Sequence, residues 1–455
     1  MACKGALPQT THEATVNAAP ARTIWTRCLT LLLAVCLGGC ALRATPEEAT
    51  PGAAETPAVP PTSNPTAAPT PTSTLVGPPD ELTIWISDQA MPLSPGRLAD
   101  VVAQQFAAFE TTHPGLAVEV LPKKATGKGG IEDLLTTAHA VAPAVLPDLV
   151  AVDSLTLSSI ARKGLTLSLE DLVSDEIRAD LYPFALQAGT VDEQWMGVQF
   201  EARGLEHALY NPTKIAAAPR TWDELYASGA TLIFPAAGRE GLVNDAFLIQ
   251  YLSTGGQLLD ESGRPALSLD ALTEVLTYYR QGIERGTVLT DVIEFSTVEQ
   301  CWPMFLQAEV TMSHISSDFY LSVLTGAPAS VPTRDGTAVV LSRGHAWALT
   351  ARDPQRQALA VQLLEWLLNP VNVNEWNEAA GSLPTRRAAF ERMERSAYVT
   401  FMYAQLETAI PYPQSEIHRD IYRAMQQAVD AVLRQGTSPE TAAATVLAAV
   451  NQETP

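Results

Sequence analysis

The side chains that could perform chemistry are scattered along this 455-residue sequence. Its seven histidines form no H-E-x-x-H motif, and neither G-x-S-x-G nor C-x-x-C occurs. The 50 acidic residues could supply a glycosidase pair, but such a pair is formed in space and leaves no fixed spacing in a sequence. We therefore predict no catalytic residue, no metal site and no cofactor, with a cell-surface hydrolase that uses paired carboxylates as the alternative.

Non-covalent capture of a small polar molecule needs only polar and aromatic side chains at loop ends that face a cleft. The carboxyl ends of parallel strands, and the loops that follow them, lie at such a crevice. Two pairs of polar residues follow predicted strands, Asp88 with Gln89 and Asp153 with Ser154. We predict that these four residues contact a ligand.

Tryptophans could stack on the face of a sugar ring. Trp85 and Trp347 fall within predicted strands, which favours packing in the core. Trp302 and Trp376 are the better candidates for contact with a ligand, and Trp195 is a further aromatic candidate.

The elements that must position these residues alternate in type. Strands are predicted at 81–86, 116–120 and 147–153 from their β-branched and apolar residues. Amphipathic helices are predicted between them, at 98–109 and 131–141. This alternation is typical of an α/β domain with a largely parallel sheet.

Later segments predict passages between two domains. The apolar stretch 195–210 predicts a strand that crosses between them, and Asn211-Pro212 ends it. Thr221-x-x-Glu224 has the spacing of a capping box, so a helix is expected to begin there. Strands at 337–341 and 346–350 are expected to return to the first domain.

Length, charge and cysteine content restrict the class of protein. A chain of 455 residues is too long for one core and predicts two domains. A net charge of -21 opposes binding to nucleic acid, whose phosphates would be repelled. Beyond the first forty residues Cys301 is the only cysteine, so we expect a buried small hydrophobe and no internal disulfide in the folded body.

The N-terminal segment has the features of an export signal. Arginines precede the apolar run 28–37, which is too short to span a bilayer. Leu37-Gly38-Gly39-Cys40 resembles the bacterial lipobox, in which the cysteine is acylated. We expect residues 1–39 to be a lipoprotein signal peptide with Cys40 as the lipidation site, and residues 40–79, rich in Pro, Thr and Ala, to be an extended tether.

Several short motifs occur at intervals along the folded region. They are Tyr210-Asn211, Pro219-Arg220-Thr221-Trp222-Asp223-Glu224-Leu225, Phe305-Leu306-Gln307-Ala308-Glu309-Val310-Thr311-Met312, Gly381-Ser382-Leu383-Pro384-Thr385 and Ile410-Pro411-Tyr412-Pro413. Together they resemble the extracellular solute-binding proteins of the maltose-binding type, the receptors of sugar ABC importers, over about Leu82 to Val450.

The resemblance implies an α/β, two-lobed fold like that of periplasmic binding proteins of type II. Each lobe would be a mostly parallel sheet flanked by helices, and hinge strands would join the two. The N-terminal lobe is expected to comprise 80–197 plus 334–380, and the C-terminal lobe 198–333 plus 381–455. Besides the four loop residues and Trp302 and Trp376, the expected ligand contacts are Glu201, Arg203, Ser316, Asp318, His345 and Tyr412.

The implied function is capture of a small molecule, expected to be a sugar, and its delivery by hinge closure to the permease subunits of an ABC transporter. The protein is expected to be extracytoplasmic, monomeric and held at the membrane only by the lipid on Cys40. A structural or sensory surface lipoprotein without a transported ligand is a third possibility.

Overall fold

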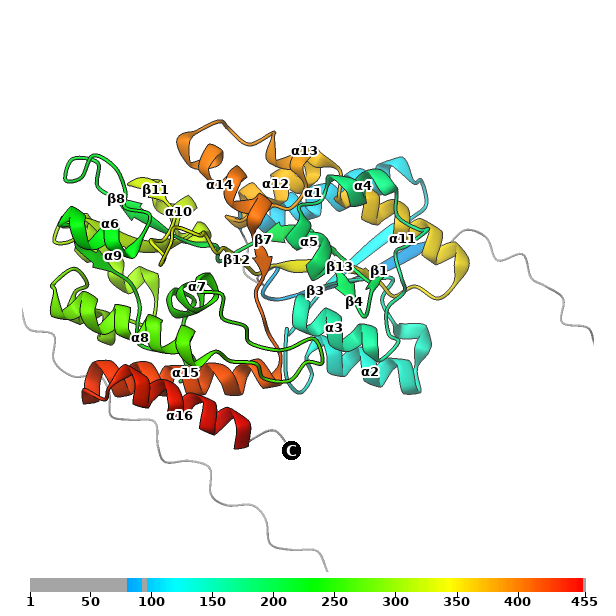
Figure 1. Cartoon of the computed structure of the whole chain (residues 1–455). Helices are drawn as coiled ribbons and strands as arrows, with labels where there is room; N and C mark the ends of the chain where they lie inside the picture. The colour runs from blue at the N-terminus through cyan, green and yellow to red at the C-terminus, as the bar shows by residue number, and fades with distance from the viewer. Residues whose placement is uncertain (1–79, 92–95, 453–455) are drawn as a thin grey trace, which may run out of the picture. The chain divides into compact units, whose positions relative to one another are not determined.

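Two β-sheets organise the folded part of the chain (Figure 1). The computed structural model describes residues 80–91 and 96–452, so the expected signal segment, Cys40 and the tether lie outside the described residues. The first sheet has the order β2-β1-β3-β13-β6, with strands Ala117–Lys123, Glu81–Ser87, Leu149–Asp153, His345–Leu349 and Val198–Gln199. The second has the order β11-β8-β10-β9, with strands Ala327–Ala329, Glu206–Tyr210, Met312–Ser316 and Leu232–Ile233.

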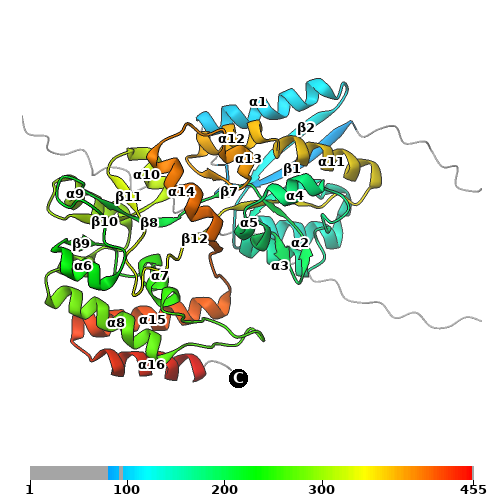
Figure 2. The ribbon, with the colours of Figure 1, turned by 45° about the horizontal axis from the view of Figure 1, so that its top comes forward.

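The first sheet is covered by helices on both faces, because alternate residues of its strands point to opposite sides. On β1, Ile84 and Ile86 pack in one core cluster and Trp85 in the other. The Ile84 side is covered by helices α1 (Arg97–Thr112), α11 (Pro354–Leu367) and α12 (Pro370–Ala380), and the Trp85 side by α2 (Ile131–Val141) and α3 (Ser154–Arg162) (Figure 2). Trp85 and Trp347 are therefore core residues, as predicted.

The strands pair in both parallel and antiparallel directions, because the chain crosses between the two sheets. β1 runs parallel to β2 and β3, whereas β13 runs antiparallel to β3 and β6. In the second sheet β8 is antiparallel to β10 and β11, and only β9 and β10 are parallel. The α/β fold class is confirmed, but the second sheet is mostly antiparallel rather than mostly parallel, because β8 enters it directly from a crossover and not through a helix.

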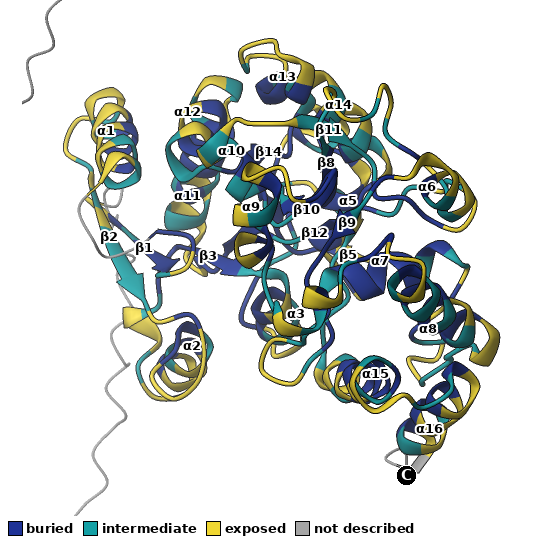
Figure 3. Cartoon of the chain, turned by 90° about the vertical axis from the view of Figure 1, so that its left-hand side faces the viewer, coloured by how far each residue is buried: buried dark blue, intermediate teal, exposed yellow. Residues whose placement is uncertain are grey.

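The helices that accompany the second sheet form layers on it. They are α6 (Trp222–Ser228), α7 (Asp245–Ser253), α8 (Leu269–Glu284), α9 (Val298–Leu306), α10 (Ser317–Val323), α15 (Glu416–Gln435) and α16 (Pro439–Gln452). Seven of the nine residues of α7 are buried, and Figure 3 shows this helix almost wholly dark blue. α8 packs against α7, α15 and α16. The outer helices α15 and α16 therefore stabilise the helix layer that contains α8, rather than the sheet directly.

The chain runs between the two sheets in several segments, here called passages. Short two-residue ladders join these passages to one another. β7 (Glu201–Ala202) pairs with β14 (Leu383–Pro384), and β12 (Leu341–Ser342) pairs with β15 (Ile410–Pro411). Arg203 and Arg343 exchange two backbone hydrogen bonds, both of 2.9 Å. Three passages are thus linked to one another where they run between the sheets. The first segment of the N-terminal lobe was expected to end at residue 197. β6 lies just past that residue and still pairs with the first sheet.

Smaller elements complete the described chain. They are β4 (Thr190–Val191), β5 (Gln194–Trp195), α4 (Asp175–Asp180), α5 (Pro183–Ala188), α13 (Arg387–Phe390), α14 (Ala397–Thr408) and two 3-10 turns, Pro143–Val145 and Thr290–Glu294. Among the helices of the described residues, none is both long enough and apolar enough to cross a bilayer.

Several local expectations can be compared with the structure. The capping box is confirmed, with the Thr221 hydroxyl accepting from the Glu224 amide at 3.1 Å. Cys301 is fully buried, as predicted. The strand expected at 337–341 is wrong except at Leu341, because the described residues provide no pairing strand beside 337–340.

Candidate functional site

A cleft of about 420 Å³ opens where the chain passages meet the second sheet. Its lining includes Gly204 from the first passage, Arg343 from the second and Tyr412 from the third. The loop before α7, the start of α9, Glu206 of β8 and Ser316 at the end of β10 form the rest of the wall. A cleft of this size lies in the usual range for small-molecule sites, roughly 300–1,000 Å³.

Arg343 is the central side chain of this wall. Its guanidinium makes two hydrogen bonds to the Asp245 carboxylate, of 2.5 and 2.7 Å, and lies 3.5 Å from the centre of the Tyr412 ring. Burial alone would lower the pKa of Arg343, but the charge of Asp245 outweighs this and raises it. The planar guanidinium is thereby fixed in one orientation by a bidentate ion pair and a cation–π contact.

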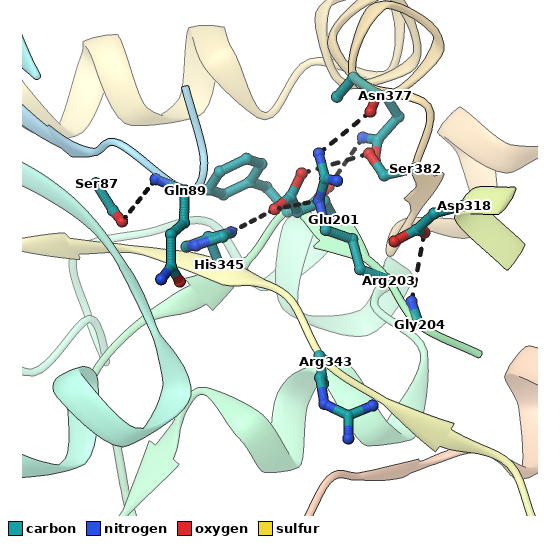
Figure 4. A network of polar contacts seen from close by, with 12 residues as sticks. Ser87, Gln89, Glu201, Arg203, Gly204, Asp318, Arg343, His345, Asn377 and Ser382 are labelled. Atoms are coloured by element: carbon teal, nitrogen blue, oxygen red, sulfur yellow. Dashed lines mark hydrogen bonds and ion pairs between the residues drawn. The ribbon is translucent and has the colours of Figure 1, made fainter. Parts of the chain in front are cut away.

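Glu201 is fully buried and is the centre of a second network, beside the cleft (Figure 4). Its carboxylate accepts from His345 Nδ1 at 2.5 Å and from the Ser382 hydroxyl at 3.3 Å. Arg203 Nε lies 3.0 Å from the same carboxylate as an ion pair, although the N–H is not aligned for a hydrogen bond. Burial would raise the pKa of Glu201, but His345 and Arg203 outweigh it and hold the pKa below its usual value.

The network connects different parts of the chain through side chains. Ser382 donates to Asn377 Oδ1 at 2.8 Å, and Asn377 donates to the backbone oxygen of Phe200 at 3.0 Å. Gly344 lies so close to the first passage that a Cβ there would collide with the Glu201 backbone oxygen. The close approach of the two passages at this point therefore requires glycine.

Asp318 extends the network toward the second sheet. It accepts from the Gly204 backbone N–H at 3.3 Å and from the Ser317 hydroxyl at 3.2 Å. Burial raises the pKa of Asp318, and the nearby Arg203 only partly opposes this rise. Of the predicted residues, the structure thus brings together Glu201, Arg203, His345 and Asp318, while Ser316 and Tyr412 line the cleft itself.

The four predicted loop residues lie at the carboxyl ends of β1 and β3. Asp88 accepts from the backbone N–H of Ala125 at 3.0 Å, and Gln89 is exposed. Asp153 caps α3, and the adjacent Ser154 is half-buried as the first residue of that helix. Asp153 also stands opposite His345 in the ladder of β3 and β13, so this edge of the sheet adjoins the Glu201 network.

The two tryptophans expected to stack on a ligand are engaged in protein contacts. Trp376 is only 2 % exposed and packs against Phe200 and Trp347. Trp302 is half-buried and contacts the rings of Phe305 and Phe319. Trp376 is therefore a core residue in this structure, with no ring face open to a ligand.

Sequence reasoning missed all six charged residues of the cleft lining. They are Glu206, Arg239, Glu240, Asp245, Glu299 and Arg343. Arg343 could have been noticed because it directly precedes the Gly344-His345 pair that begins the returning strand. No similar signal marks the others, which come from three separate loops and strands. Within the described residues no three potential metal ligands are grouped.

Comparison with known proteins gives a family and a set of similar folds. The family model described as bacterial extracellular solute-binding protein matches residues 104–402. Curated proteins include no match to this chain. The structures below are all under 25 % identical to the chain, so their likeness shows the fold alone.

Similar solved structures include three sugar-binding proteins. A cyclo/maltodextrin-binding protein complexed with maltotetraose has a TM-score of 0.67 at 16 % identity, covering 83 % of this chain and 98 % of its own. The sugar-binding protein MalE of Xanthomonas citri has a TM-score of 0.65 at 19 % identity, covering 82 % and 96 %. The cyclic α-maltosyl-1,6-maltose binding protein of Arthrobacter globiformis has a TM-score of 0.63 at 20 % identity, covering 83 % and 99 %.

Proposed function

This chain belongs to the family of bacterial extracellular solute-binding proteins, and on that premise we propose that it captures a carbohydrate in the cleft and delivers it to an ABC transporter permease. The observation that carries the proposal is the position of the cleft, whose wall includes one residue from each of three linked chain passages, Gly204, Arg343 and Tyr412. A ligand that contacts these residues is coupled to any movement of the two sheets about the passages.

The proposal assigns roles to the two groups of polar residues. Glu206, Ser316 and Tyr412 bind the ligand from the C-terminal lobe, and Arg343 binds it from the second passage between the sheets. Closure brings the N-terminal lobe, 80–197 plus 334–380, against the C-terminal lobe, 198–333 plus 381–455. The four loop residues predicted from the sequence, Asp88, Gln89, Asp153 and Ser154, then contact the ligand from the opposite side.

The Glu201 network acts as the hinge in this proposal. Its hydrogen bonds join the passages directly, so the passages bend together rather than separately. His345 and Arg203 position the carboxylate, and they do not contact the ligand. Movement of the lobes is therefore expected to be confined to the few residues on either side of the network.

A carbohydrate ligand is supported by the solved structures of similar fold. One of them is complexed with maltotetraose, and another is a cyclic α-maltosyl-1,6-maltose binding protein. The polar lining of the cleft supports the same class, because sugar hydroxyls need hydrogen-bond partners when they leave water. The expected monomer docks onto the permease subunits once the ligand is bound.

The anchor is proposed from the sequence motif that ends at Cys40. An acyl chain on this cysteine holds the protein at the outer face of the membrane, and the Pro-rich segment after it separates the folded region from the lipid. Labelling of expressing cells with radioactive palmitate tests this assignment. Label should enter the wild-type protein and be absent from a Cys40→Ala variant.

The test of binding is a panel of neutral and charged saccharides in a thermal-shift assay, followed by calorimetric titration. A ligand present at about one hundred times its Kd stabilises the folded state by about 2.7 kcal/mol. We expect saturable stabilisation by at least one saccharide and no change in that saccharide by chromatography.

Two outcomes would count against the proposal. Product formation that is lost in a carboxylate variant would identify a hydrolase, and the absence of stabilisation by any saccharide would remove the carbohydrate assignment. The matched control is Glu261→Gln, an exposed carboxylate outside the lining of the cleft, which should leave binding unchanged.

A further inference from the structure

Charged side chains, rather than aromatic rings, form the surface that the cleft presents to a ligand. Among the described residues that line it, Tyr412 is the only aromatic one, and the Arg343 guanidinium covers one face of its ring at 3.5 Å. Trp302 is not part of the lining. Stacking of a sugar ring on an aromatic face therefore contributes little here, and the charged side chains must decide which ligand binds.

Acidic side chains outnumber basic ones in this lining. Asp245 and Arg343 neutralise each other through their two hydrogen bonds. Of the remaining charged residues that line the cleft, Glu206, Glu240 and Glu299 are acidic and Arg239 is basic. The unneutralised charge of the wall is therefore negative.

Glu206 differs from the other two carboxylates because it is buried. Only 6 % of the residue is exposed, yet it lines the cleft. One carboxylate oxygen, Oε1, lies 2.5 Å from His314 Nδ1. The other oxygen has no hydrogen-bond partner among the described residues. The free oxygen of this carboxylate faces the cleft, where water or a donor group of a ligand can bind it.

His314 contacts only one oxygen of this carboxylate. Its other ring nitrogen, Nε2, is buried and has no partner in the described chain. Burial raises the pKa of Glu206, and the contact with His314 and the charge of Arg343 only partly oppose this rise.

We infer that the cleft selects a cationic saccharide, a ligand whose protonated amine binds the free carboxylate oxygen of Glu206 while its hydroxyl groups bind the neighbouring polar lining. The inference rests on the proposed function, because it specifies the chemical class of the carbohydrate. Glu299, exposed at the start of α9, adds long-range attraction for the same cation. An amine on Glu206 would supply the missing charge in a partly water-excluded site, where the attraction is stronger than in solution.

The experiment compares three disaccharides of the same linkage by calorimetric titration. They are the β1,4-linked disaccharide of glucosamine, cellobiose with hydroxyls in place of both amines, and the N-acetylated disaccharide, which has the bulk but no charge. We expect the first to bind about 10- to 100-fold more tightly than the other two, because hydrogen bonds to charged groups are the stronger ones. The preference should decrease as salt is added.

Variants identify the residues responsible. Glu206→Gln should bind the amine no more tightly than the neutral sugars, and Glu299→Gln, on the exposed rim, should lose part of the preference. Because Glu206 is buried and its variant could be unstable, Glu299→Gln together with the salt dependence provides an independent readout. Glu261→Gln, outside the lining, should keep the full preference.

The possible results separate this inference from the proposed function. If cellobiose binds as tightly as the amine or more tightly, the inference is overturned and the carbohydrate receptor stands. If the amine binds best but neither Glu206→Gln nor Glu299→Gln reduces its advantage, the assignment to this wall is overturned. If no sugar of this set or of the wider panel binds, the proposed function fails and the inference fails with it.

Discussion

Replacing Glu201 by glutamine removes the charge at the centre of the buried network while keeping the size of the side chain. In the wild-type protein the fully buried carboxylate contacts His345 Nδ1 at 2.5 Å, Arg203 Nε at 3.0 Å and the Ser382 hydroxyl at 3.3 Å. The amide keeps one acceptor oxygen instead of two, and it would leave the Arg203 charge without its partner.

The magnitude follows from this burial. Removing one partner of a buried ion pair costs about 3–5 kcal/mol, because the other charge stays buried without compensation. Glu201 is 0 % exposed, but the side chain of Arg203 is 24 % exposed, so we expect the lower end of this range. A folded domain is stable by only about 5–15 kcal/mol, so the Glu201→Gln variant should unfold at clearly lower urea concentration.

The pH dependence of this difference is fixed by the direction of the pKa shift. The pKa of Glu201 in the folded protein lies below its usual value, so the group stabilises the fold above the unfolded-state pKa of about 4.3. Its contribution is lost as the pH falls through the folded-state pKa. The difference in unfolding free energy between wild type and variant should therefore be constant above about pH 5.5 and shrink below about pH 4.

The assay is urea unfolding followed by tryptophan fluorescence at a series of pH values. Asp192→Asn is the matched control, because it breaks an exposed ion pair with Arg162 and should change the midpoint far less. A difference below about 1 kcal/mol at pH 7 would refute the reasoning, since that is the range of exposed pairs. A difference that persists unchanged into acid would also refute it.

Three further predictions concern other residues. Arg343→Lys keeps the charge but loses the two-point contact with Asp245, so the Kd for the ligand should rise about tenfold by calorimetric titration. Burial lowers the pKa of His207 to about 4, against about 6.5 in the unfolded chain. The unfolding free energy of the wild-type protein should therefore fall by about 3 kcal/mol through this group as the pH falls from 6.5 to 4. Urea unfolding of the His207→Asn variant should not show this decrease. Thr221→Ala removes the cap of α6 and should lower the unfolding free energy by about 1 kcal/mol in the same assay at pH 7, with Thr213→Ala as an exposed control.

Short-range patterns in the sequence gave reliable expectations. The alternation of apolar residues on β1 predicted the strand, and Thr221 with Glu224 predicted the start of α6. The strand expected at 337–341 failed because apolar β-branched residues indicate strand tendency, while a strand also needs a partner at the right place. Trp376 was expected at the ligand, but its helix turns it toward the ring of Phe200.

The sequence by itself determined the family, the division into strands and helices, and the charge of the molecule, since each depends on composition or on residues a few positions apart. The tertiary structure alone decided which polar side chains meet. His345 and Ser382 lie 144 and 181 positions from Glu201 and still bind its carboxylate. Glu206 is buried at the cleft because it lies on β8, and its partner His314 follows it 108 positions later in the sequence. Contacts over such distances depend on how the passages fold together, and no local spacing encodes that.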